Sequence, residues 1–154
     1  MNRGELLTKR IFDILFSAVV IVILSPLLLI TALCIKLFMP GPVFFKQIRA
    51  GRGGEPFSIL KFRSMMVDKT AEENFDFSKD LQRITCLGKF IRRTKIDELP
   101  QLINVIKGDM SLVGPRPAPL VQVEQYSEFQ KKRLLMRPGM TGLAQVNGNI
   151  ALTW

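Results

Sequence analysis

Histidine is absent from this chain of 154 residues, and cysteine occurs only twice, at Cys34 and Cys86. Without histidine the chain lacks the usual general base and the usual zinc ligand, and two distant cysteines cannot complete a tetrahedral thiolate site. The two cysteines do not indicate a disulfide framework either, so a reducing, cytosolic environment is expected for the polar part of the chain. Any bound metal should therefore have oxygen ligands, and Mg²⁺ is the first expectation.

Acidic residues are also scarce, because 13 Asp and Glu stand against 22 Lys and Arg and give a net charge of +9. This balance favours anionic partners, namely nucleic acid, an acidic membrane surface or phosphorylated substrates. Charge alone does not choose among the three. The length suits one domain with an anchor, and a chain of this length can bury a hydrophobic core without disulfide or metal cross-links.

One long stretch has no charge at all, the 22 residues from Ile14 to Ile35. As a helix it would reach about 33 Å, enough for a hydrocarbon core of about 30 Å. Ser25 and Pro26 lie near its midpoint. Proline removes a backbone hydrogen bond and clashes with the preceding turn, so we expect the helix to bend or break there.

The charges that flank this stretch do not fix its orientation. Basic residues occur on both sides of it: Arg3, Lys9 and Arg10 before it, and Lys36, Lys46, Arg49 and Arg52 after it. Under the positive-inside rule such a balance gives no orientation for a spanning helix, and it is what a re-entrant helix with both ends on the cytoplasmic face would show. A spanning helix with a proline kink is equally compatible with these residues.

The remaining sequence predicts short elements. Val43 to Ile48 and Phe57 to Phe62 favour strands, and the glycine-rich residues 51–54 between them predict a β-hairpin. Residues 68–81 are polar and predict a surface helix with a loop. The fold class that we predict is α+β and mainly helical, with an N-terminal membrane helix, a small hairpin and interfacial amphipathic helices.

Two apolar periodicities predict helices after the hairpin. The first has Leu99, Leu102, Ile103 and Ile106 on one face and should close at Lys107-Gly108. In it Asp97 would lie at or near the N-cap and Pro100 in the first turn. The second helix has Leu120, Val123, Tyr126 and Phe129 on one side, with Glu128 paired to Lys132.

One acidic pair, Asp97 and Glu98, stands inside a basic segment that includes Arg92, Arg93, Lys95 and Lys107. The ordinary interpretation is structural, with Asp97 as an N-cap and Glu98 as a partner of the helix dipole. The guanidinium groups nearby, and that of Arg116 between two prolines, instead suit phosphate oxygens. Carboxylates beside such donors either hold Mg²⁺ or attack phosphorus.

The absence of histidine and of a reactive cysteine narrows the choice of nucleophile to carboxylate, hydroxyl or lysine. A carboxylate that attacks a phosphoryl group gives an acyl-phosphate intermediate. We therefore favour Asp97 as the nucleophile and Glu98 as the metal ligand. Mg²⁺ would neutralise charge on phosphate oxygens as the leaving group departs.

Six segments together closely resemble the bacterial sugar transferase family, the monotopic polyprenol-phosphate phosphoglycosyl transferases. They are residues 9–13 (KRIFD), Ser25-Pro26, residues 61–65 (KFRSM), residues 97–102 (DELPQL), residues 108–117 (GDMSLVGPRP) and the region from Arg137-Pro138-Gly139 to Gly148. The resemblance covers nearly the whole chain. It implies transfer of a sugar 1-phosphate from a UDP-sugar to undecaprenyl phosphate, with release of UMP, in the first membrane step of bacterial glycan synthesis.

The resemblance also implies roles for residues. Asp97 would be the nucleophile on the sugar-bearing phosphorus and Glu98 would serve the Mg²⁺ site with it, Mn²⁺ being an alternative ion. Arg92 and Arg116 would contact phosphate, with Lys61 and Arg137 as weaker candidates. The membrane helix would re-enter at Ser25 and Pro26, on the cytoplasmic face of the inner membrane. Membrane lipids would be partners, nucleic acid would not, and a homo-oligomer is compatible with the family.

Two features depart from the family pattern. Lys95 stands where members commonly have a small hydroxyl residue, and the chain ends at Trp154 where members continue into further helices. We thus expect residues 1–40 to form a re-entrant anchor and 41–154 a cytosolic catalytic domain whose C-terminal part is missing.

Two rival functions remain at the level of sequence. One is a membrane-tethered, basic lipid-binding or nucleic-acid-binding protein without chemistry, whose binding to DNA would weaken steeply with salt. The other is a phosphatase that acts on polyprenyl phosphates and releases inorganic phosphate.

Overall fold

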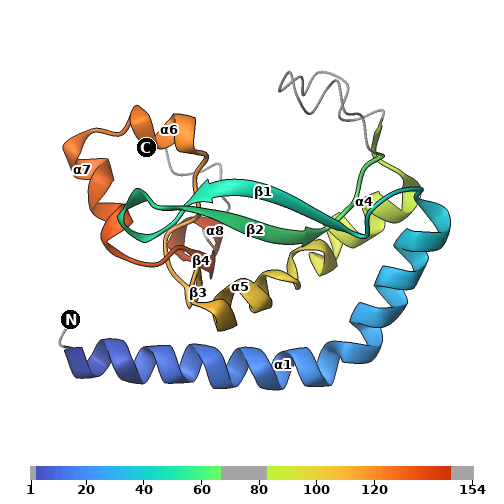
Figure 1. Ribbon diagram of the computed structural model, residues 1–154, viewed down its shortest axis with the longest axis horizontal. Helices are drawn as coiled ribbons and strands as arrows, with labels where there is room; N and C mark the ends of the chain where they lie inside the picture. Colours follow the sequence, from blue (N-terminus) through green and yellow to red (C-terminus); the bar gives the residue numbers. More distant parts are fainter. Residues whose placement is uncertain (1–2, 67–82, 147–154) are drawn as a thin grey trace. The chain divides into compact units, whose positions relative to one another are not determined.

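The computed structural model describes residues 3–66 and 83–146 (Figure 1). These residues form two compact units. The first unit comprises described residues from 1–23, 46–60 and 101–154, and the second comprises those from 24–45 and 61–100. The surface helix predicted for 68–81 lies outside the described residues. The predicted boundary between residues 40 and 41 stays a prediction.

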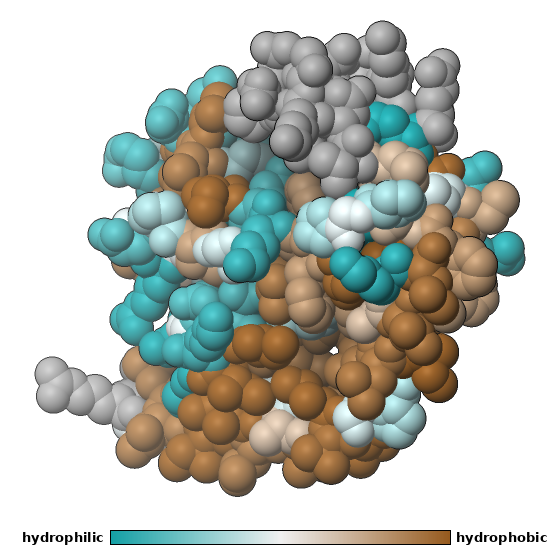
Figure 2. Space-filling view, turned by 45° about the vertical axis from the view of Figure 1, so that its right-hand side comes forward, coloured by the Kyte–Doolittle hydropathy of each residue, from teal (hydrophilic) through white to brown (hydrophobic). Residues whose placement is uncertain are grey.

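Helix α1 runs from Arg3 to Phe38, and Pro26 lies inside it. It is the one helix of the described residues that is long and apolar enough to cross a membrane. Many of its large apolar side chains, from Leu7 through Leu15, Val22 and Leu29 to Leu37, are exposed to more than half. Hydrophobic side chains gather over α1 in Figure 2. The helix is continuous through Ser25 and Pro26, so a break there stays a prediction.

Only narrow stripes of α1 are buried, and each belongs to one unit. Asp13 and Ser17 are buried in the first unit. Thr31, Ile35 and Met39, the last just beyond the end of the helix, are buried in the second. Each stripe repeats every four residues, which keeps its members on one helix face. The other faces of α1 are therefore left for a different apolar environment.

The predicted hairpin is confirmed. Strand β1 (Phe44–Ala50) pairs with β2 (Pro56–Phe62), and a 3-10 turn η1 (Arg52–Gly54) joins them. Gly53 and Gly54 have φ of 72° and 84°, backbone angles that residues with a Cβ atom rarely adopt. The first strand extends two residues beyond the predicted Ile48.

The core of the second unit forms around helix α4 (Cys86–Arg93). The Thr85 side chain caps this helix by accepting a hydrogen bond from the Gly88 amide. Ile91 packs with Ile35, Met39 and Phe62. The turn η2 (Ile96–Glu98) follows α4 in the same unit.

The core of the first unit contains Ile59, Val105 and Met110. Helix α5 (Gln101–Lys107) confirms the first predicted periodicity, and Gly108, with φ of 104°, ends it. Strand β3 (Ser111–Val113) then pairs in parallel with β4 (Gly139–Thr141), in a register that aligns Ser111 with Gly139. Helix α8 (Leu143–Val146) follows β4.

The prediction of a second, continuous helix is wrong. The chain instead forms three shorter elements: α6 (Leu120–Glu124), α7 (Glu128–Lys131) and the 3-10 turn η3 (Lys132–Leu135). Ser127 interrupts the periodicity because it caps α7 in a capping box with Gln130. The predicted pairing of Glu128 is also wrong. Its carboxylate instead pairs with the Lys131 Nζ atom at 2.7 Å, while the Lys132 Nζ atom lies over the Phe129 ring.

Candidate active site

The acidic pair lies in a tight turn between α4 and α5. Asp97 and Glu98 belong to η2, which begins after Lys95 in the left-handed conformation with φ of 61°. The Glu98 amide donates to the Lys95 carbonyl at 3.2 Å. Asp97 is therefore not the N-cap of α5, which begins four residues later at Gln101. The sequence expectation failed because the left-handed Lys95 opens a separate turn ahead of the apolar helix.

Glu98 is held by a lysine from the hairpin. The Lys61 Nζ atom at the end of β2 lies 2.9 Å from Glu98 Oε1, and both side chains are about a quarter exposed. This ion pair fixes the carboxylate of Glu98 while leaving it accessible to solvent. The predicted Lys61 and Glu98 thus meet in one site.

Asp97 is the more deeply placed carboxylate, only 9% exposed. Its Oδ1 atom is buried and has no hydrogen-bond partner among the described residues. Burial raises the pKa of this carboxyl group above its ordinary value, and the charge of Glu98 raises it further. Lys61, Lys95 and Arg92 oppose that shift. A buried carboxylate oxygen without a partner is costly, and it is available for a bond to a ligand.

Arg92 approaches the same site from α4. Its Nε donates to Ser64 Oγ at 2.7 Å, and one terminal nitrogen lies 2.7 Å from Met65 Sδ. The side chain remains exposed, and its charge acts on Asp97. The segment after β2 therefore orients Arg92 so that it can contact an anion near the acidic pair.

Arg63, the residue after the end of β2, is buried in the second unit. Its guanidinium donates to the backbone carbonyls of Met39 and Pro40, the latter at 2.7 Å. The carbonyls follow the end of α1, so Arg63 ties that end to the strand that carries Lys61. Its position inside the motif at 61–65 was the available signal.

The other two predicted phosphate ligands, Arg116 and Arg137, belong to the first unit, whereas Lys61, Arg92, Asp97 and Glu98 belong to the second. Arg116 is exposed, and Arg137 donates its Nε to the Gly108 carbonyl at 2.8 Å. Burial lowers the pKa of the Arg49 guanidinium, and the charge of Arg116 lowers it further. Arg49 and Arg116 therefore form a second concentration of positive charge, which the sequence did not reveal.

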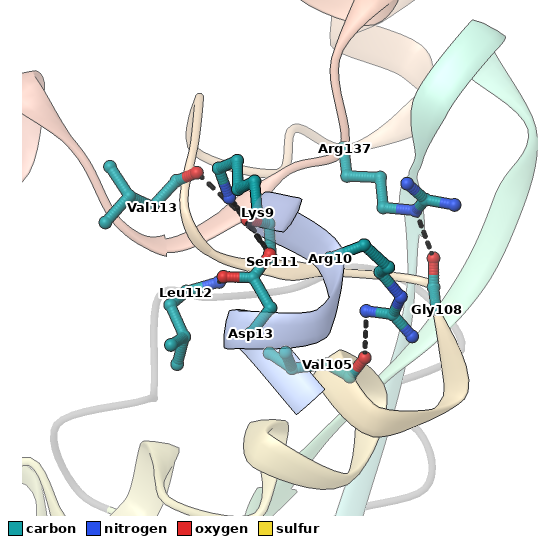
Figure 3. Close-up of polar contacts among 9 residues, drawn as sticks. All are labelled: Lys9, Arg10, Asp13, Val105, Gly108, Ser111, Leu112, Val113 and Arg137. Atoms are coloured by element: carbon teal, nitrogen blue, oxygen red, sulfur yellow. Dashed lines mark hydrogen bonds and ion pairs between the residues drawn. The ribbon is translucent and has the colours of Figure 1, made fainter. Parts of the chain in front are cut away.

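A polar network in the first unit also escaped the sequence analysis (Figure 3). The buried Asp13 of α1 accepts hydrogen bonds from Lys9 Nζ at 2.9 Å and from Ser111 Oγ at 2.7 Å. Lys9 contacts Ser111 as well. The spacing of Lys9 and Asp13, four apart on a helix, was a usable signal for the ion pair. No spacing rule joined them to Ser111.

The acidic pair fits a magnesium ion in number and kind of donor. The described residues contain no group of three or more His, Cys, Asp or Glu side chains that could enclose a metal. Mg²⁺ commonly takes only one or two carboxylates and completes its octahedral shell with water and substrate phosphates. The uncommitted Asp97 Oδ1 and the accessible Glu98 satisfy that requirement.

Comparison with known proteins identifies relatives across almost the whole chain. A UDP-glucose:undecaprenyl-phosphate glucose-1-phosphate transferase from Klebsiella pneumoniae is 42% identical over 151 residues, which cover 96% of this chain and 32% of the relative. A UDP-N-acetylgalactosamine-undecaprenyl-phosphate N-acetylgalactosaminephosphotransferase from Aeromonas hydrophila is 48% identical over 142 residues, 90% of this chain and 33% of the relative.

A shorter relative, the uncharacterized sugar transferase EpsL of Bacillus subtilis, is 42% identical over 149 residues, covering 97% of this chain and 73% of the relative. The chain therefore spans about a third of the two longer relatives and most of the shorter one. The sequence model of the bacterial sugar transferases matches residues 4–154. This match, together with the relatives, shows that the chain belongs to the bacterial sugar transferase family.

Proposed function

We propose that this protein transfers a sugar 1-phosphate from a UDP-sugar to undecaprenyl phosphate and releases UMP, at the start of bacterial glycan synthesis. The observation that carries the proposal is the buried Asp97 oxygen without a partner beside the Glu98–Lys61 ion pair. The names of the Klebsiella and Aeromonas relatives support the acceptor and the class of donor.

Asp97 is the proposed nucleophile. Its carboxylate oxygen forms a bond to the sugar-bearing phosphorus, the bond from that phosphorus to the bridging oxygen breaks, and UMP leaves with the electron pair. An oxygen of the lipid phosphate then attacks the same phosphorus and displaces the Asp97 carboxylate. Burial removes water molecules that would otherwise solvate the carboxylate and reduce its nucleophilicity. The same loss of hydration raises the pKa of the carboxyl group.

The neighbouring groups hold and compensate charge. Lys61 orients Glu98, and Arg92 places a guanidinium near the acidic pair for the donor phosphates. Glu98, with Asp97, would hold Mg²⁺ or Mn²⁺. The ion would neutralise charge on the phosphate oxygens. We propose that Arg116, from the first unit, serves as a further phosphate ligand.

We also propose that α1 re-enters the membrane and that the catalytic residues lie on the cytoplasmic face of the inner membrane. Near its start, Asp13 accepts a hydrogen bond from Ser111, and beyond its end, the Met39 carbonyl accepts one from Arg63. Ser111 and Arg63 both follow α1 in the chain, and the described residues contain no second candidate span. Both contacts therefore favour placing the two ends of α1 on one side.

The test is a measurement of UMP release in the absence of the lipid acceptor. The full chain in neutral detergent, mixed with UDP-sugars and Mg²⁺, should release up to one equivalent of UMP, and intact-protein mass spectrometry should find the phosphosugar on Asp97. Asp97→Asn keeps the shape of the side chain and should abolish both signals. Glu124→Gln, which removes an exposed carboxylate on α6, is the matched control and should retain them.

The alternatives give different outcomes in the same assay. Full turnover by Asp97→Asn would exclude the covalent route, and turnover without any adduct in wild type would favour direct attack by the lipid phosphate. Release of inorganic phosphate would indicate a phosphatase. Undiminished turnover in excess EDTA would contradict the metal role of Glu98.

A further inference from the structure

A small cavity in the first unit carries a strong excess of positive charge. It has a volume of about 200 Å³. Its walls come from α1, from η1 and from the segments around β3 and β4, all within that unit. Four basic side chains line it (Lys9, Arg10, Arg52 and Arg137), against the single carboxylate of Asp13. Asp13 is paired with Lys9 and its charge also acts on Arg10, so one carboxylate of the lining faces four cations.

The fold holds these cations close together. Arg10 donates to the carbonyls of Val105 and Ile106 at 2.6 and 3.0 Å, and Arg137 donates to that of Gly108 at 2.8 Å. Both guanidinium groups are thus fixed at the C-terminal end of α5, as Figure 3 shows. The partial negative charge of a helix end attracts them there, but neutral carbonyls do not cancel two full charges.

Donors remain for a ligand. Arg137 uses only Nε in its bond to Gly108, and no bond to another described residue uses its two terminal nitrogens. Arg52, in the exposed turn η1, makes no side-chain hydrogen bond or ion pair within the described part of the chain. A guanidinium with two parallel donors suits the oxygens of a phosphate group.

Apart from Ser111, the uncharged part of the wall is apolar, and it includes a residue of the long apolar helix α1. Leu6, Val113, Leu135 and Met136 line the cavity, and all four are exposed, from 42% for Leu6 to 71% for Leu135. Leu6 belongs to α1, whose neighbouring turns present Leu7 and Ile11 outward. A hydrocarbon chain attached to a phosphate in the cavity would find an apolar path there. The volume is below the roughly 300–1,000 Å³ typical of sites for drug-sized ligands, so it suits a head group rather than a sugar nucleotide.

We propose that this cavity, formed by Lys9, Arg10, Arg52 and Arg137, binds the phosphate group of a membrane lipid whose chain lies along Leu6 and Val113. The chemistry is shared by the polyprenyl phosphate acceptor and by bulk anionic phospholipid, and both are sources of the head group. The proposal concerns binding alone and does not depend on chemistry at Asp97.

The experiment is native mass spectrometry of the full chain released from neutral detergent micelles, titrated separately with undecaprenyl phosphate, phosphatidylglycerol, undecaprenol and inorganic phosphate. We expect one lipid phosphate retained per chain and no retention of undecaprenol. The double variant Arg52→Gln/Arg137→Gln should weaken retention at least about tenfold, because it removes two charge-assisted contacts. Preference for one of the two lipids identifies the source of the head group.

A matched variant controls for net charge. Lys46→Gln/Lys107→Gln also removes two charges from exposed positions of the first unit, outside the cavity, and should bind lipid as wild type does. Val113→Glu keeps every cation but adds a negative charge to the wall, and it should also reduce retention. Asp97→Asn should retain lipid fully, which separates this result from any failure of the proposed chemistry.

Three outcomes would overturn the proposal. Equal weakening by the two double variants would mean a general charge effect. Retention of undecaprenol, or retention of inorganic phosphate as strong as that of lipid, would mean that the cavity does not recognise the combination of a phosphate group and a lipid chain. Unchanged retention in Val113→Glu, with the fold intact by circular dichroism, would place the lipid elsewhere.

Discussion

At the residue scale, the proposed nucleophile Asp97 lies in a position that costs stability. Its buried Oδ1 lacks a partner, and its pKa is raised chiefly by burial and then by Glu98. Lys61, Lys95 and Arg92 offset part of that cost without removing it. Lys95, in the left-handed conformation, adds backbone strain immediately before the pair. Strain and an unsatisfied acid in the same turn are typical of functional sites.

The raised pKa predicts a pH-dependent gain in stability for Asp97→Asn. In the folded state the carboxyl group holds its proton to higher pH than the value of about 3.9 for an unfolded chain. The native state therefore binds more protons in that window, and wild-type stability falls as pH rises through it. Asp97→Asn does not titrate, so it should be more stable than wild type at pH 7.

The measurement is urea unfolding in detergent micelles across the acid and neutral range. The advantage of Asp97→Asn should shrink as pH falls towards about 4, where the unfolded carboxyl group also gains its proton. Glu124→Gln serves as the matched change at an exposed acid. An Asp97→Asn variant that is less stable than wild type at pH 7 would show that the surrounding cations outweigh burial.

At the scale of elements, the candidate active site depends on how closely α4 approaches the segment after β2. Gly88 on α4 makes this approach possible, because a Cβ built there would lie 1.9 Å from the Ser64 carbonyl oxygen. One turn further along α4, Arg92 donates to the Ser64 side chain. The same contact therefore packs the helix and orients the arginine.

Gly88→Ala should consequently damage both stability and activity. The added methyl meets backbone rather than a flexible side chain, so α4 must shift, at a cost of about 1–3 kcal/mol in unfolding free energy. The shift should break the Arg92–Ser64 hydrogen bond and slow the UMP burst. Gly4→Ala is the control, since a Cβ at Gly4 meets nothing within 4 Å. Equal stability and burst rate in the two variants would show that α4 does not depend on this close approach.

Elements with local signals were predictable from the sequence. The hairpin follows from two apolar runs and a glycine turn, and α5 follows from its periodicity and from Gly108. The split between α6 and α7 was missed because one capping serine outweighed a continuous apolar pattern. The position of Asp97 was missed because nothing in the sequence marks Lys95 as left-handed.

At the scale of the whole molecule, the sequence allowed candidate site residues to be selected, but it did not predict which distant segments would be in contact. It selected Lys61, Arg92, Asp97 and Glu98, and the second unit brings them together. It could not place Asp13 against Ser111, 98 residues apart, because that contact depends on the tertiary fold. The cavity of the first unit was likewise not predictable, because its lining comes from four segments that are distant in the sequence.

The topology of α1 is the property on which the whole arrangement depends, and it can be tested directly. With Cys34 and Cys86 replaced by Ser, a single Cys is introduced at position 3 or at Lys46 and probed in intact cells with a membrane-impermeant thiol reagent. If both ends of the helix lie on the cytoplasmic side, neither Cys should react until the membrane is opened. Labelling of one of the two from outside would establish a spanning helix.

The helix itself supplies the matched variants for this test. Replacing Ser25 and Pro26 together by Leu restores the backbone hydrogen bond that proline removes, and it should straighten α1. In that variant the Cys at position 3 should become reactive from outside while the Cys at Lys46 stays protected. Ser25→Leu alone retains Pro26 and should keep the wild-type labelling pattern, because the proline rather than the serine interrupts the hydrogen bonding of the helix.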